Sequence, residues 1–284
     1  MLKCFREFLT KVQYALYAYF YEYITRLRWK LGVKQTPHSL PASLVVSLTS
    51  YPPRFKKLHL TLKCLMLQTI RADHIILWVS EEDYAKLPPQ VMALMAAGLE
   101  IRTTQDLGSY KKIIPALDAF PGAYIATADD DLYYHPSWLQ ELVEGIDVPK
   151  SVPCHRAHEI RFNSQGGYLP YNEWISNTSY RGVAKNLFPT SGGGALYSPH
   201  TLDHTKEDRE NGLTLCPFAD DVWLYFMGRK NSAVYKTIAI KRETINWRHS
   251  QKVGLWKHNV LSGGNDGQLD KLAAIYGYPP VVEP

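Results

Sequence analysis

The chain has 284 residues, of which 45% are hydrophobic and 21% charged, a composition typical of a globular protein with a substantial core. Its net charge of +5 resides in residues 1–34, because the remaining 250 residues carry equal numbers of basic and acidic side chains. Because residues 35–284 carry no net charge, a long polyanion is not an expected ligand, and we expect no nucleic-acid partner. The four cysteines are widely spaced and form no zinc motif, which suits free thiols in a reducing cytoplasm.

Residues 2 to about 31 are predicted to form a helix, because the first Gly or Pro is Gly32. A heptad-like apolar seam runs along it at Phe5, Leu9, Val12, Leu16, Tyr19 and Tyr23. The uncharged run between Lys11 and Glu22 is about half of the ~20 residues that a membrane-spanning helix needs. We expect residues 1–31 of this basic, aromatic segment (1–34) to lie on a membrane surface; pairing with another chain and packing on its own body are the alternatives.

The body alternates short apolar runs with segments of helical spacing. Strands are predicted at residues 43–49, 74–80, 99–103 and 124–128, and helices at 58–69, 88–97, 110–119 and 137–145. This alternation indicates βαβ units, an α/β fold class and a mostly parallel sheet. Several strands end in polar or acidic residues, as expected at the rim of a ligand site.

Three consecutive acids, Asp129, Asp130 and Asp131, follow the strand predicted at residues 124–128. Burying them is costly unless each carboxylate is paired or coordinates a metal. At a strand end, Asp129 and Asp131 project to the same side and can hold one hard divalent cation through oxygen ligands. A polar turn with a helix N-cap is the alternative.

A second acidic pair, Asp220 and Asp221, precedes an apolar helix. One carboxylate there suits a general base, although two helix-capping residues would look the same. Lys111 and Lys112 precede another helical segment, where they could pair with phosphates or form a solvated basic face. The glycines at 192–194 permit close approach of the backbone to a ligand, and the chain contains no phosphate-loop motif.

Taken in order, these motifs resemble a known family. The motifs are SLTSYPPR (47–54), LGSYKK (107–112), TADDD (127–131), SGGGALYS (191–198), FADDVWL (218–224), WRHS (247–250) and NDGQLDKL (265–272). The set resembles the GT-A fold of nucleotide-sugar glycosyltransferases, nearest to inverting family-2-like bacterial enzymes, from Ser43 to the end. The resemblance implies a Rossmann-like mixed, mostly parallel sheet flanked by helices, with a donor half (35–150) and an acceptor half (151–284) that includes a C-terminal closing segment.

The resemblance also implies roles for individual residues. Asp221 would be the catalytic base, oriented by Asp220. A Mn²⁺ or Mg²⁺ ion would be held by Asp131, Asp129 and His249, with His258 as the fallback for the histidine. The nucleotide-sugar pocket would contain Thr49, Ser50, Arg54, Glu81 (or Glu82), Asp106, Lys111, Lys112, Asp129 and Asp130. Asn265 and Asp266 would order the closing segment.

The expected function is therefore metal-dependent, inverting transfer of a sugar from a nucleoside-diphosphate donor, with UDP the expected nucleotide. The acceptor would be a hydroxyl of a glycan or lipid-linked glycan, as in bacterial surface polysaccharide synthesis, on the inner face of the cell membrane. One alternative is a sugar-phosphate nucleotidyltransferase, but such enzymes commonly carry an early Gly-rich loop where this chain has SLTSYPPR. The other is a non-catalytic nucleotide-sugar-binding protein, because a fold alone does not establish activity.

Overall fold

The computed structural model describes residues 2–238, 240, 244–248, 250 and 264–279. Its helices are α1 (Leu2–Leu31), α2 (Phe55–Met66), α3 (Glu81–Tyr84), α4 (Pro89–Met92), α5 (Ile114–Ala119), α6 (Trp138–Glu144), α7 (Lys206–Leu215), α8 (Asp220–Lys230) and α9 (Gly264–Tyr276). Short 3-10 turns are η1 (Pro52–Arg54), η2 (Ala93–Ala97), η3 (Gly108–Lys112), η4 (Tyr171–Glu173) and η5 (Ser191–Gly193).

Eight strands within the described residues form one sheet in the order β10-β13-β8-β12-β6-β2-β4-β5. They are β2 (Leu44–Thr49), β4 (His74–Ser80), β5 (Glu100–Thr104), β6 (Tyr124–Ala128), β8 (Ser151–Cys154), β10 (Gly182–Val183), β12 (Ala195–Tyr197) and β13 (Val234–Thr237). Three two-stranded sheets pair β1 (Thr36–Pro37) with β3 (Ile70–Arg71), β9 (Ala157–Glu159) with β11 (Leu187–Pro189), and β7 (Leu132–Tyr133) with β14 (Ile245–Asn246).

The main sheet is mixed and mostly parallel. Strands β6, β2, β4 and β5 run parallel, as do β8 and β13, whereas β12 runs antiparallel between β6 and β8, and β10 antiparallel to β13. The predicted α/β fold class is therefore confirmed. The chain builds outward from β2 to β5 and then returns to β6 on the other side of β2. Such a switch point opens a ligand crevice outside the carboxyl ends of β2 and β6.

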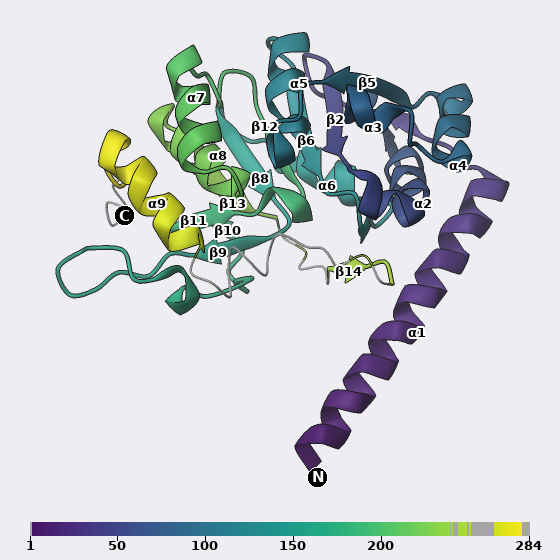
Figure 1. The fold of residues 1–284 in the computed structure, drawn as a ribbon, viewed down its shortest axis with the longest axis horizontal. Helices are drawn as coiled ribbons and strands as arrows, with labels where there is room; N and C mark the ends of the chain where they lie inside the picture. Colours follow the sequence, from purple (N-terminus) through teal and green to yellow (C-terminus); the bar gives the residue numbers. More distant parts are fainter. Residues whose placement is uncertain (1, 239, 241–243, 249, 251–263, 280–284) are drawn as a thin grey trace.

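Alternation along the buried strands explains the layers (Figure 1). Val45 of β2 joins one hydrophobic core, whereas Leu44 and Val46 join the core on the opposite face. Residues of α5, α8 and α9 complete the first core, and residues of α2, α4 and α6 complete the second. The sheet is thus covered by helices on both faces, so only its edges and strand ends remain for a site.

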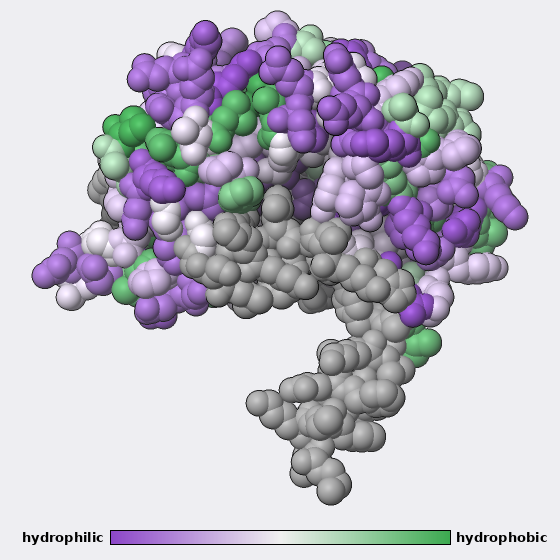
Figure 2. Space-filling view, in the orientation of Figure 1, coloured by the Kyte–Doolittle hydropathy of each residue, from purple (hydrophilic) through white to green (hydrophobic). Residues whose placement is uncertain are grey.

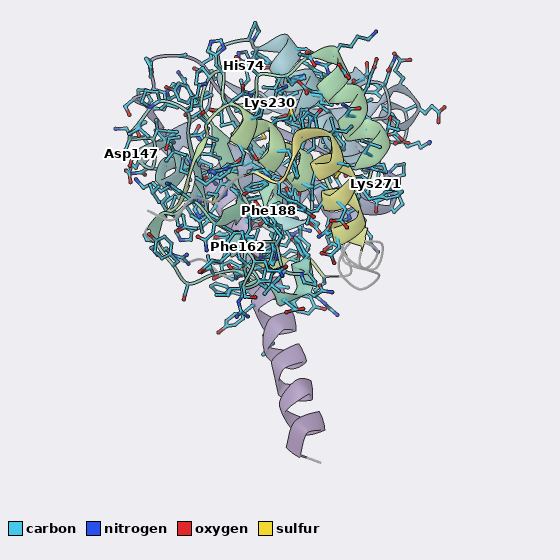
Figure 3. All side chains as sticks on the ribbon, turned by 90° about the vertical axis from the view of Figure 1, so that its left-hand side faces the viewer. His74, Asp147, Phe162, Phe188, Lys230 and Lys271 are labelled. Atoms are coloured by element: carbon cyan, nitrogen blue, oxygen red, sulfur yellow. The ribbon has the colours of Figure 1, made fainter. Side chains whose placement is uncertain are left out.

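Helix α1 leaves the body. Its N-terminal part extends away from the other elements in two perpendicular views (Figures 1 and 3). Ala18 and Thr25 are buried against the body, where the ring of Tyr21 lies 4.2 Å from that of Tyr133. The opposite side is exposed and apolar, at Leu16, Phe20, Tyr23 and Leu27, whereas the flanking ring of Tyr19 lies 4.2 Å from the guanidinium of Arg248. Among the described residues, no helix is both long enough and apolar enough to cross a membrane.

Strand β12 enters the sheet through Gly194, whose φ of +110° lies in the region that favours glycine. A Cβ at this position would overlap the indole nitrogen of Trp138. That nitrogen donates a hydrogen bond to the carbonyl oxygen of Gly193 at 3.1 Å, and the Trp138 ring is buried. Gly194 therefore fixes how closely the glycine-rich segment approaches α6.

We predict that Gly194→Ala lowers the free energy of unfolding by about 3 kcal/mol, because it combines an unfavourable backbone conformation with overpacking against Trp138. Gly166→Ala is the matched control, because Gly166 also has a positive φ, +79°, but its Cβ would meet nothing within 4 Å. In this control the free energy of unfolding should fall by about 1 kcal/mol. Urea unfolding measures both, and equal losses would show that the contact with Trp138 is unimportant.

Candidate active site

The triple acid lies at the switch point, as the sequence predicts for a ligand site. The hydroxyl of Ser50, after β2, donates to Asp130 Oδ2 at 2.5 Å. The guanidinium of Arg54 pairs with Asp130 Oδ1 at 3.1 Å and also with Asp131. The Thr61 hydroxyl donates to the carbonyl oxygen of Asp130 at 2.9 Å, which fixes the turn against α2. Three of the predicted donor-pocket residues, Ser50, Arg54 and Asp130, are thus brought together.

The three carboxylates differ in accessibility. The Asp129 side chain is 42% exposed, whereas those of Asp130 and Asp131 are 8% and 5% exposed and face Arg54. Burial, opposed by Arg54, raises the pKa of Asp130 to about 7 and also raises the pKa of Asp131. Burial would raise the pKa of Asp129 as well, but the charge of Lys112 and its hydrogen bond lower it overall. Asp129 is therefore the ionised, accessible member of the group.

Lys112 joins the two acidic groups. Its buried ammonium lies 3.0 Å from Asp129 Oδ1 and 3.0 Å from Asp220 Oδ2. Its own carbonyl oxygen accepts a hydrogen bond from Ser47 Oγ at 2.5 Å, which anchors η3 to β2. Although burial would lower the pKa of Lys112, the carboxylates of Asp129 and Asp220 raise it, so the amine is charged. One side chain thus holds the triple acid and the second acidic pair in a single site.

Lys111 has a different environment. Its side chain is almost completely buried and its ammonium pairs with Asp106, whose carboxylate is 68% exposed. Asp106 also accepts a hydrogen bond from the backbone N–H of Gly108 at 3.2 Å. The two adjacent lysines therefore separate into one that faces the acidic centre and one that pairs at the rim.

Asp221 lies in the first turn of helix α8, with its carboxylate held by the glycine-rich segment. Its Oδ1 accepts a hydrogen bond from the backbone N–H of Ser191 at 2.8 Å, and the Ser191 hydroxyl lies 3.4 Å from Asp220 Oδ2. Burial and the neighbouring charge of Asp220 raise the pKa of Asp221 to about 6. A carboxylate with such a pKa is suited to accept a proton near neutral pH.

Gly192 allows the glycine-rich segment to contact Asp129. A Cβ at Gly192 would overlap Asp129 Oδ2. Tyr134, which the sequence reasoning missed, links the two segments, because its hydroxyl accepts from Asp129 N and donates to the carbonyl oxygen of Gly192, both at 2.7 Å. This part of the site is fixed by backbone contacts that no sequence motif specifies.

The other predicted residues lie at or near the same edge. Thr49 uses its hydroxyl to donate to the carbonyl oxygen of Trp78 at 2.8 Å, and so contributes to the sheet. Glu81 and Glu82 are exposed at the start of α3, after β4, and neither contacts the triple acid in the part of the chain that the structure describes. His249 and the fallback His258 lie outside the described residues.

A further cation was missed by the sequence reasoning. Arg156, between β8 and β9, is half-buried beside Gly193, and its charge helps to lower the pKa of Asp129. It also acts on Tyr171. Burial and the charge of Asp221 raise the pKa of Tyr171 overall, and the charge of Arg156 and a hydrogen bond from Asn265 oppose this rise. Neither residue stands in a recognisable motif, so only the fold brings them to this site.

The charges of the centre suit a divalent cation. Five carboxylates converge there, at Asp129, Asp130, Asp131, Asp220 and Asp221, and the described cations among them are Arg54, Lys112 and Arg156. The described residues contain no cluster of three or more His, Cys, Asp or Glu side chains arranged to hold a metal. One or two carboxylates together with substrate phosphates and water are, however, a usual magnesium environment. Asp129, the most exposed carboxylate of the triple acid, fits that requirement.

A family comparison bears directly on this region. Residues 99–200 match the model described as Glycosyl transferase family 2, a segment that contains Lys112, the triple acid and the glycine-rich segment. This match confirms the predicted resemblance to family-2 glycosyltransferases and supports a glycosyltransferase with the GT-A fold. No curated protein sequence matches the chain significantly.

Solved structures with distant similarity include both enzyme classes considered above. S. aureus TarS (residues 1–349) has a TM-score of 0.48 and 14% identity, with 71% of this chain and 59% of that chain covered. Glucosyl-3-phosphoglycerate synthase from Mycobacterium tuberculosis, solved with Mn²⁺ and UDP, has a TM-score of 0.42 and 14% identity, with coverages of 84% and 82%. The inositol-1-phosphate CTP transferase of T. maritima has a TM-score of 0.40 and 11% identity, with coverages of 71% and 86%. At these scores the likenesses do not distinguish between functions.

We predict that Gly192→Ala displaces the Asp129 carboxylate without unfolding the protein, because the new methyl group meets only the end of a half-exposed side chain. Mn²⁺-dependent nucleotide binding, measured by calorimetry, should weaken about tenfold, while the urea midpoint changes little. Gly267→Ala is the control, because its Cβ would have open space within helix α9. Unchanged binding in Gly192→Ala would contradict the role given to Asp129.

Proposed function

We propose that the chain is a metal-dependent, inverting glycosyltransferase that moves a sugar from a nucleoside-diphosphate donor, UDP in our proposal, to a hydroxyl of a glycan or lipid-linked glycan. The observation that carries this proposal is the position of Lys112, which binds Asp129 of the triple acid and Asp220 beside Asp221. A transferase needs an anion-binding donor side and a proton-accepting side in one site, and this contact brings both together.

We propose that the donor half (35–150) binds the nucleotide sugar at the switch point. Asp129 and Asp131 would hold Mn²⁺ or Mg²⁺, which when bound neutralises charge that develops on the leaving diphosphate. Lys112 supplies a second positive charge at the same edge, while Ser50 and Arg54 hold the turn through Asp130. Thr49, Glu81, Asp106 and Lys111 keep the proposed role of lining the nucleotide pocket, and His249 that of a third metal ligand.

We propose that the acceptor half (151–284) supplies the base. Asp221 would take the proton from the acceptor hydroxyl as the oxygen attacks the anomeric carbon from the face opposite the leaving group. The hydrogen bond from Ser191 N orients this carboxylate, and the adjacent charge of Asp220 favours proton uptake by Asp221. Asp220 itself is held by Lys112 and so would position the base.

The family match favours sugar transfer over the two alternatives. A nucleotidyltransferase would release pyrophosphate from a nucleoside triphosphate and a sugar phosphate. A non-catalytic binding protein has no need of a carboxylate whose pKa is raised to about 6, as that of Asp221 is.

We predict that Asp129→Asn and Asp221→Asn impair different steps. The test measures UDP affinity with and without Mn²⁺, and UDP release from a panel of UDP-sugars with water as the acceptor. Asp129→Asn should weaken Mn²⁺-dependent UDP binding about tenfold or more. Asp221→Asn should retain UDP affinity but slow UDP release by about a hundredfold or more, because it removes the base. In the parent protein the rate should fall below pH 6, where Asp221 becomes protonated.

Asp203→Asn, a change at an exposed acid that pairs with the exposed His200, is the control and should match the parent protein. Full UDP release by both active-site variants would exclude the proposed mechanism. Pyrophosphate release from UTP and a sugar phosphate, without turnover of any UDP-sugar, would instead identify a nucleotidyltransferase.

We further propose that α1 places the enzyme on an anionic membrane surface, which we take to be the cytoplasmic face of the cell membrane. Its exposed apolar stripe at Leu16, Phe20, Tyr23 and Leu27 lies on the side of the helix opposite the buried Ala18 and Thr25. The body itself shows hydrophobic residues scattered among hydrophilic ones on the face in Figure 2. All of the net positive charge lies in residues 1–34, which suits anionic lipid rather than a second apolar helix of like charge.

We predict that Leu16→Ser, Phe20→Ser and Tyr23→Ser together reduce binding to vesicles that contain phosphatidylglycerol by about tenfold or more, because each removes buried apolar area at the interface. Co-sedimentation measures this effect, and UDP affinity should not change. Met95→Ser, at an exposed apolar residue of the body, is the control. Unchanged vesicle binding, or a self-association that the triple variant abolishes, would contradict the membrane proposal.

A further inference from the structure

Beside the proposed base there is a cation that the reaction scheme above does not use. Arg156 forms no ion pair and no side-chain hydrogen bond with any residue that the structure describes. By contrast, Arg54 and Lys112 are each paired with two carboxylates of the centre, and Lys111 is paired with Asp106. A half-buried guanidinium without a partner gives up hydration and gains no ion pair, so its position calls for a ligand.

The backbone holds Arg156 at the boundary between the two acidic groups. Its carbonyl oxygen accepts a hydrogen bond from Thr190 N at 3.0 Å, and its side chain lies against Gly193, where a Cβ would stand 2.7 Å from that of Arg156. Its charge helps to lower the pKa of Asp129 and of His158 and opposes the rise in the pKa of Tyr171. Arg156 thus acts both on the triple acid and on residues of the proposed acceptor half.

Two polar groups accompany Arg156. Tyr171 receives a hydrogen bond from Asn265, and its pKa is raised by burial and by the charge of Asp221. The Oδ1 atom of Asn265 has no hydrogen-bond partner among the residues that the structure describes, although the residue is only 6% exposed. A buried acceptor without a donor is costly unless a ligand supplies one. Tyr171 N in turn donates to Asp266 at 2.7 Å, which ties η4 to α9.

From this arrangement we infer that Arg156, Tyr171 and Asn265 form an acceptor subsite for a sugar that carries an acidic group, either a carboxylate or a phosphate. The planar guanidinium offers paired donors that match the oxygens of either group. The free Oδ1 of Asn265 accepts from a sugar hydroxyl, and Tyr171 provides a ring and a hydroxyl beside Asp221. This inference rests on the proposed function, because it assigns the acceptor of that reaction.

The test measures binding of three probes to the full-length protein saturated with UDP and Mn²⁺, by calorimetry or ligand-observed NMR. The probes are methyl glucoside, methyl glucuronide and methyl glucoside 6-phosphate, which are neutral, carboxylate and phosphate forms of one sugar. At least one acidic probe should bind about tenfold more tightly than the neutral probe, as expected for a charge-assisted hydrogen bond. The preferred acidic probe identifies the acidic group.

Arg156→Gln should bring the ratio of acidic-probe affinity to neutral-probe affinity close to one and leave UDP affinity within twofold of the parent protein. Arg156→Lys should retain part of the preference for the acidic probe. Asn265→Ala should weaken the binding of all three probes to the same extent, because it removes only the contact with a sugar hydroxyl. Arg161→Gln, a change at an exposed arginine five residues away, is the control and should change neither quantity.

Equal binding of all three probes to the parent protein would overturn the subsite. So would a loss of UDP affinity in Arg156→Gln as large as that in Asp129→Asn, which would assign Arg156 to the donor diphosphate instead. If the parent protein binds no UDP, the proposed function fails. The probe preference, measured again without UDP, then decides the subsite independently.

Discussion

The contact on which the rest of the site depends is the buried ammonium of Lys112 between Asp129 and Asp220. Asp129 follows β6 and Asp220 begins α8, so the ion pairs join segments 91 residues apart in the chain. A charge at this depth is tolerated only because both carboxylates face it and because η3 is held to β2 by Ser47. Removing the lysine would leave the like charges of Asp129 and Asp220 facing one another without a cation between them.

The fold and the first acidic group could be predicted because their determinants are local. Apolar runs of strand length, separated by helical spacing, define the parallel strands β2, β4, β5 and β6, and the carboxyl ends of such strands meet at one edge. Ser50 and Asp130, 80 residues apart in the chain, form a hydrogen bond for that reason. The role of the second acidic pair, Asp220 and Asp221, was inferred from the family resemblance. Its approach to the triple acid depends on β12, which is inserted antiparallel between β6 and β8.

What sequence reasoning missed depends on contacts between distant segments. Two adjacent lysines look equivalent in the sequence, yet Lys112 faces Asp129 whereas Lys111 faces Asp106, because the 3-10 turn η3 directs them apart. In α1 the seam predicted from spacing includes Leu16, Tyr19 and Tyr23, but these residues are exposed and the body packs against Ala18 and Thr25 instead. The spacing of apolar residues in a helix predicts an apolar face, but it does not predict which surface packs against that face.

The electrostatics of the centre give a physical reason for this construction. Five carboxylates around Arg54, Lys112 and Arg156 leave an excess of negative charge, and burial holds the pKa of Asp130 and Asp221 above the usual range. Such a cluster is a cost to stability that a structural role would not require, since apolar residues would pack there more favourably. In the proposed reaction, a cation bound at Asp129 would offset this excess, and proton uptake by Asp221 would remove one of the buried charges. The features that destabilise the ligand-free site are thus the ones that would favour donor binding and deprotonation of the acceptor in the proposed mechanism.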